Sequence, residues 1–80
     1  MIAQYWWSKN ESGTVYRYME DTGTYSFMRA EVYRLDSRPG WRASIYGDSR
    51  IQRTGAEFTV SDPATGKQLV EDVMALRSQR

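Results

Sequence analysis

Turn-forming residues divide this chain into short segments at nearly regular intervals. Glycines, prolines, asparagines and aspartates separate runs that are rich in aromatic and β-branched residues. Short runs of this composition, bounded by such residues, are typical of β-strands joined by brief connections. Because strands that follow one another through short turns pair antiparallel, the pattern predicts an antiparallel β-meander of four to five strands.

Five segments fit the strand pattern. They are residues 3–8, 14–19, 24–35, 41–47 and 56–60. The third segment exceeds the usual length of a strand, which favours a bulge or a bend within it. A loop is expected to begin at Gly47 and to end near Gly55.

Side chains of the third segment should alternate between the two faces of the sheet. One predicted face carries Met28, Ala30 and Val32. The other carries Tyr25, Phe27, Arg29, Glu31, Tyr33 and Leu35. The strand therefore has one small apolar face and one mixed aromatic and charged face.

Pro39 and Gly40 stand between the third and fourth segments. Proline presets φ at position i+1 of a type II turn, and glycine accepts the positive φ of position i+2. We therefore predict a hairpin here, with residues 41–47 antiparallel to residues 24–35.

The C-terminal third predicts an amphipathic helix over residues 62–78. Ser61 or Asp62 can serve as the N-cap and Pro63 as the first helical residue. The apolar positions that recur at helical spacing are Leu69, Val73 and Leu76, with Val70 and Met74 beside them. Residues 62–67 are also compatible with a turn, because Gly66 costs a helix interior about 1 kcal/mol relative to alanine. In that alternative the helix begins nearer Lys67.

Together these elements predict a single α+β domain over residues 1–80. The meander occupies residues 3–60, and the helix packs on one face of the sheet. A sheet with a helix on one side is a stable two-layer arrangement. The pattern leaves open which face the helix covers.

The composition argues against catalysis. The 80 residues contain no Cys and no His, which removes disulfides, thiolate metal sites, the cysteine nucleophile and the usual general base near neutral pH. The adjacent acids Glu20-Asp21 and Glu71-Asp72 do not converge on one point, and no glycine-rich phosphate loop is present. We therefore expect a non-catalytic protein without cofactor or metal.

No membrane or export signal stands out. The first residues include no basic start followed by an apolar run, and no stretch approaches the roughly 20 apolar residues of a membrane helix. We expect a cytoplasmic protein without a membrane partner.

Charge is unevenly distributed although the net charge is only +1. The middle third carries an excess of three positive charges. Its basic residues are Arg29, Arg34, Arg38, Arg42, Arg50 and Arg53, and its acids are Glu31, Asp36 and Asp48. Arginine suits interfaces because it makes forked contacts to carboxylate and phosphate and stacks on aromatic rings. These arginines are equally able to pair with nearby acids on solvated strand faces.

Arginine and tyrosine alternate on the predicted strands. The candidate partner-binding residues are Arg17, Arg29, Tyr33, Arg42 and Tyr46. If the helix covers the face of Val32 and Ile45, the opposite face displays these side chains, and Tyr and Arg are enriched in binding hot spots. Of the adjacent Trp6 and Trp7, one should enter the core and the other should remain a candidate anchor for a partner or a dimer.

The order of elements resembles that of several anti-CRISPR proteins. The features are the strand at residues 24–35, the Arg38-Pro39-Gly40 turn, the strand at residues 41–47 and the helix after Asp62-Pro63. Such phage-encoded proteins bind a CRISPR effector complex and block its access to target DNA. The resemblance covers most of the chain in architecture, includes no diagnostic motif, and transfers no functional residue. This chain also lacks the strong acidity of the DNA mimics among them.

These features predict a small interaction protein that occupies a surface of a larger protein complex such as a CRISPR effector. An alternative is a nucleic-acid-binding module that uses an Arg/Tyr sheet surface, since aromatic rings stack on bases and arginines neutralise phosphates. A third is an assembly component of a phage particle that self-associates through Trp6 or Trp7. The sequence leaves the oligomeric state open.

Overall fold

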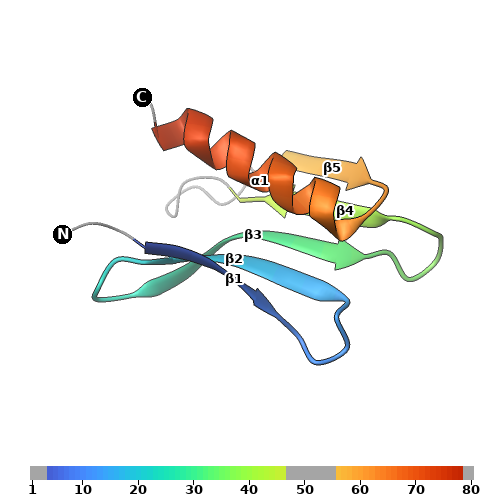
Figure 1. Cartoon of the computed structure of the whole chain (residues 1–80), viewed down its shortest axis with the longest axis horizontal. Helices are drawn as coiled ribbons and strands as arrows, with labels where there is room; N and C mark the ends of the chain where they lie inside the picture. Colours follow the sequence, from blue (N-terminus) through green and yellow to red (C-terminus); the bar gives the residue numbers. More distant parts are fainter. Residues whose placement is uncertain (1–3, 47–55, 79–80) are drawn as a thin grey trace.

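A five-stranded antiparallel sheet with one helix on one side makes up the fold (Figure 1). The computed structural model describes residues 4–46 and 56–78, so the loop expected after Gly47 lies outside the described residues. The strands are β1 (Gln4–Lys9), β2 (Val15–Asp21), β3 (Ser26–Arg34), β4 (Trp41–Ile45) and β5 (Ala56–Val60), and the helix is α1 (Pro63–Ser78). Their spatial order is the order in the chain, which confirms the predicted meander and its C-terminal helix.

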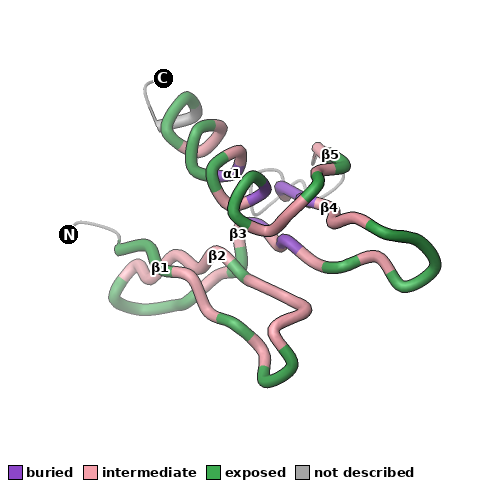
Figure 2. The backbone as a smooth tube through the Cα atoms, turned by 45° about the vertical axis from the view of Figure 1, so that its right-hand side comes forward, coloured by how far each residue is buried: buried purple, intermediate pink, exposed green. Residues whose placement is uncertain are grey.

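The core lies between α1 and the strands β3 and β4. Among the described residues, five are both hydrophobic and fully buried: Ala30, Val32, Ala43, Ile45 and Val70. The buried stretches of β3, β4 and α1 face one another (Figure 2). The helix therefore covers the Val32/Ile45 face, and it leaves the other face of the sheet uncovered.

Asp62 caps the N-terminus of α1. Its Oδ1 accepts a hydrogen bond from the backbone N–H of Thr65 at 2.8 Å, and its Oδ2 accepts one from the Thr65 hydroxyl at 3.1 Å. These hydrogen bonds to Thr65 lower the pKa of the Asp62 carboxyl. The helix thus begins at Pro63 and not near Lys67, and Gly66 lies within it.

The apolar stripe of α1 differs from the predicted one. Val70 is fully buried, and Leu69, Val73 and Met74 pack against the core at its edges, but Leu76 is 66% exposed. The placement of Leu76 in the stripe is therefore wrong. Gly66 is buried against β3 and β5, so the face toward the sheet runs through Gly66 and Val70 and turns Leu76 outward.

The β3–β4 hairpin is present, but its connection is longer than a type II turn. Trp41 pairs with Arg34, and the N–H of Leu35 donates to the carbonyl of Gly40 at 3.1 Å. Residues 35–40 therefore form a loop, and a two-residue turn on Pro39-Gly40 does not close the hairpin. Gly40 has a φ of 123°, a conformation that L side chains rarely adopt, which accounts for glycine at this position.

Trp7 ties the edge strand β1 to the helix. Its indole Nε1 donates to Oε2 of Glu71 at 2.9 Å. The Lys67 ammonium lies 5.5 Å from the centroid of the Trp7 ring and 4.6 Å from that of Tyr16. Of the two adjacent tryptophans, Trp7 therefore packs toward the core, whereas Trp6 is 41% exposed on the opposite side.

Candidate protein-binding face

The side of the sheet away from α1 carries a continuous set of polar and aromatic residues. Residues that pair across antiparallel strands point to the same face, so the strand register gives the members of each row. One row consists of Ser8, Arg17, Glu31, Ser44 and Glu57. The next row consists of Val15, Tyr33, Arg42 and Thr59. We call this side of the sheet the open face.

Arginines and glutamates pair on the open face. Nε of Arg17 lies 3.4 Å from Oε2 of Glu31, and Nη1 of Arg42 lies 3.6 Å from Oε2 of Glu57. The Arg17 and Glu57 side chains are 45% and 62% exposed, so these pairs are partly solvated and contribute little to stability. Each pair holds an arginine and a glutamate side chain next to each other on this face.

Glu31 also joins Tyr46 to the open face. The Tyr46 hydroxyl donates to Oε1 of Glu31 at 2.5 Å. Burial of the phenol and this hydrogen bond raise the pKa of Tyr46 from its ordinary value of 10.0 to about 12. The glutamate is thereby held between Arg17 and Tyr46 at the centre of the face.

The raised pKa predicts a late tyrosine titration. Because the folded state favours the neutral phenol, its contribution to stability is complete below pH 10 and is lost as the pH rises toward about 12. We expect the ultraviolet absorbance of tyrosinate to show a last step near pH 12 in the wild-type protein, and Tyr46→Phe to remove it. Tyr25→Phe, at an exposed position outside the open face, is the matched control variant. A last step that survives in Tyr46→Phe would contradict the assignment.

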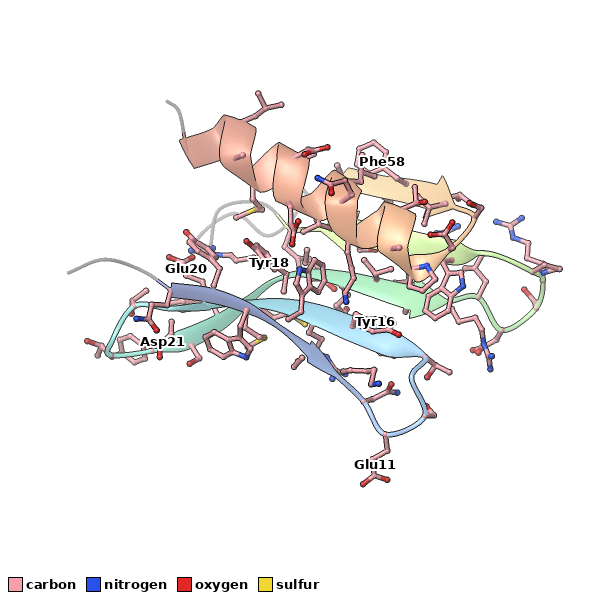
Figure 3. The ribbon with its side chains drawn as sticks, viewed as in Figure 1. Glu11, Tyr16, Tyr18, Glu20, Asp21 and Phe58 are labelled. Atoms are coloured by element: carbon pink, nitrogen blue, oxygen red, sulfur yellow. The ribbon has the colours of Figure 1, made fainter. Side chains whose placement is uncertain are left out.

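Arg29 is the one predicted site residue that does not lie on the open face. The β2–β3 register shifts between Tyr18 and Met19, so that Tyr18 pairs with Ala30 and Met19 with Met28. Arg29 is the extra residue of this bulge and has no partner in the β2–β3 register. Its Nε lies 2.5 Å from Oε1 of Glu20. Glu20 lies on the helix side of the sheet, whereas Asp21 points away from it (Figure 3). The predicted face of Arg29 is therefore wrong, although the expected bulge in the long third strand is present.

The same bulge moves Met28 to the open face. Strict alternation predicted Met28 on the other face, together with Val32. Met28 lies opposite Met19, and Met19 lies opposite Trp6. Trp6 and Met28 are 41% and 37% exposed. The open face therefore has an apolar end beside its charged centre.

A hollow of about 590 Å³ lies at the other end of the open face. Its walls include Glu31 and Tyr33 from β3, and loop residues on both sides. The complete lining is Ser12, Thr14, Val15, Glu31, Tyr33, Arg34 and Asp36.

The structure thus brings four of the five predicted residues to one face: Arg17, Tyr33, Arg42 and Tyr46. Sequence reasoning missed the importance of Glu31 and Glu57, which organise the arginines and Tyr46. The signal for Glu31 was present, since alternation places it on the same face as Tyr33. Glu57 gave no signal, because only the β4–β5 register brings it to Arg42.

No protein family, curated protein or solved structure matches this chain. In the described residues, no group of three or more acidic side chains is arranged to hold a metal ion. Within the same residues, no helix has the length and apolarity needed to cross a membrane.

Proposed function

We propose that this chain is a small non-catalytic protein that binds a larger protein through its open face. The observation that carries the proposal is the gathering of Arg17, Tyr33, Arg42 and Tyr46 on the side of the sheet that α1 leaves uncovered. Tyr and Arg supply much of the energy of protein interfaces, because they combine large contact area with hydrogen bonding. Strand pairing holds these side chains in fixed positions, which reduces the entropy lost on binding.

The charge of the open face favours a protein partner. Two arginines, Arg17 and Arg42, face two glutamates, Glu31 and Glu57, so these charges cancel. Arg29 adds no positive charge to this face, since it pairs with Glu20 on the helix side. Arg50 and Arg53 lie outside the described residues. A phosphate backbone needs unpaired positive charge, whereas a mixed array suits a protein surface.

For the partner we propose a CRISPR effector complex, whose access to target DNA the bound chain would block. The support is the resemblance in architecture to anti-CRISPR proteins and the balanced charge of the paired side chains on the open face. Such a face suits occupation of a protein surface better than imitation of a DNA duplex. Nucleic-acid binding is the alternative function that the experiment must distinguish.

The test is capture of purified effector complex, and of proteins from host lysate, by the immobilised chain. A variant that combines Tyr33→Ala, Arg42→Ala and Tyr46→Ala removes the open-face anchors. Gln68→Ala combined with Tyr25→Ala changes exposed residues outside the open face and serves as the control. We expect nuclease-resistant capture by the wild type and the control, and at least tenfold weaker capture by the triple variant, with circular dichroism verifying that both variants fold.

Two results would contradict this proposal in different ways. Equal capture by the triple variant would show that the open face is not the site. Loss of all captured material after nuclease, with affinity that falls steeply as salt rises, would favour the nucleic-acid-binding module, because phosphate neutralisation releases counterions.

A further inference from the structure

Strand β1 is an edge of the sheet, and among the described residues only β2 pairs with it. It pairs with β2 over its whole length without a register shift, it contains no proline, and its one charged residue is Lys9 at its end. Natural edge strands usually carry bulges, prolines or central charges that prevent pairing with other chains. The other edge, β5, is different, because α1 packs against it and the exposed Glu57, its second residue, places a charge within the strand. Figure 1 shows β1 at the edge of the sheet opposite to β5.

The free hydrogen-bonding groups of β1 can be assigned. The N–H of Asn10 donates to the carbonyl of Val15 at 3.0 Å, so this pair is a hydrogen-bonded one. Hydrogen-bonded and non-hydrogen-bonded pairs alternate along antiparallel strands. Trp6 and Ser8 therefore direct their backbone groups toward β2, whereas Tyr5, Trp7 and Lys9 direct theirs away from the sheet.

We propose that two copies of this chain form a dimer by antiparallel pairing of their β1 strands. In the register we propose, a two-fold axis passes beside Trp6 and runs perpendicular to the sheet. Trp6 of each copy then lies opposite Trp6 of the other on the open face, and Tyr5 lies opposite Trp7 of the other copy on the helix face. The two sheets become one continuous sheet that presents two open faces side by side.

Three observations favour a second copy as the occupant of this edge. The outward backbone groups belong to Tyr5 and Trp7, so their mutual pairing joins donors and acceptors at matching positions. In the proposed register the open faces of the two copies lie on the same side of the joined sheet. The two Trp6 side chains, each 41% exposed in a single chain, therefore contact each other. The charge of Lys9 lies at opposite ends of the two antiparallel strands, so no like charges face each other.

The test is the mass of the purified protein alone, measured by sedimentation and light scattering over a range of concentrations. We expect a concentration-dependent dimer of the 9.3 kDa chain. Tyr5→Pro deletes one outward N–H, which an edge strand tolerates within its own sheet. Tyr5→Ala, which keeps the N–H, is the matched control. Dimerisation should be at least tenfold weaker in Tyr5→Pro than in Tyr5→Ala.

A second variant tests the register without depending on proline. Directly opposed residues of a non-hydrogen-bonded pair have Cα atoms about 4.5 Å apart, within the range that a disulfide spans. The chain has no cysteine, so Trp6→Cys introduces a single thiol, which we expect to form an intermolecular disulfide on mild oxidation. Ser8→Cys on the same face should not, because Ser8 would lie opposite Gln4 of the other copy.

The proposal is overturned if the wild type keeps the mass of a monomer up to its limit of solubility, or if Tyr5→Pro dimerises as tightly as Tyr5→Ala. Crosslinking of Ser8→Cys in preference to Trp6→Cys would overturn the register. None of these measurements involves another protein, so their outcome is independent of whether the open face binds the proposed partner.

Discussion

Gly66→Ala is expected to lower the free energy of unfolding by about 2 kcal/mol, because overpacking a core costs about 1–3 kcal/mol. At an open helix position the same change would stabilise by about 1 kcal/mol. Here an added Cβ would lie 2.8 Å and 3.2 Å from the two Cγ atoms of Val32 and 3.3 Å from Cγ2 of Val60. Val32 is fully buried in the central strand and its β-branched side chain has little rotamer freedom, so the helix must move away from the sheet.

The physical cause can be isolated by repeating the substitution beside a smaller neighbour. In a Val32→Ala background the closest contacts disappear, and Gly66→Ala should become neutral or stabilising. Ala64→Gly, at an exposed position two residues nearer to the N-cap, controls for helix propensity and should cost about 1 kcal/mol or less. Chemical denaturation of the four variants measures the coupling. A destabilisation by Gly66→Ala that persists unchanged without Val32 would refute the contact as its origin.

Gly66 also explains why the start of the helix could not be decided from the sequence. Helix propensity counts Gly66 as a defect and favours a later start, near Lys67. The structure reverses that reasoning, since glycine is what lets the first turns of α1 lie directly on Val32. A close approach between segments distant in the chain depends on tertiary packing, so the sequence around Gly66 does not predict it.

The elements that did follow from the sequence are those with local causes. Asp62 and Pro63 predicted the helix cap because an N-cap acceptor and a first-turn proline act within a few residues. The meander followed from regularly spaced turn residues. The length of the connection at Pro39-Gly40 did not follow, because the pairing of Arg34 with Trp41 depends on the packing of both strands and not on the turn alone.

The site was predictable to the extent that alternation held. Tyr33 and Arg42 were placed on one face by counting residues, and they are direct partners across β3 and β4. Arg29 was misplaced because it is the extra residue of a bulge, where strict alternation between the two faces breaks down. The length of the third strand predicted a bulge. The position of the bulge depends on how β3 pairs with β2, and the sequence of β3 alone does not determine that pairing.

Trp7 is the second position at which we expect a substitution to reduce stability strongly. Trp7→Ala should lower the free energy of unfolding by about 2–3 kcal/mol, somewhat less than the 3–5 kcal/mol of a fully buried aromatic, because Trp7 is only partly buried. The loss removes packing against Tyr18, whose ring centroid lies 4.8 Å away, and the contacts with Lys67 and Glu71 that join β1 to the helix. For a domain of this size the melting temperature should fall by roughly 10 °C or more.

Trp6→Ala is the matched control one residue away, and it should cost about 1 kcal/mol or less, as surface substitutions usually do. Both variants should be measured in dilute solution, so that any association through β1 does not contribute. Trp7→Phe keeps most of the packing and loses only the indole N–H donated to the exposed Glu71 carboxylate, so it should fall between them. Equal losses for Trp6→Ala and Trp7→Ala would contradict the division of the two rings between the open face and the core. A large loss confined to Trp7 would show that its combined contacts with Tyr18, Lys67 and Glu71 stabilise the fold, whereas the ring of Trp6 contributes little.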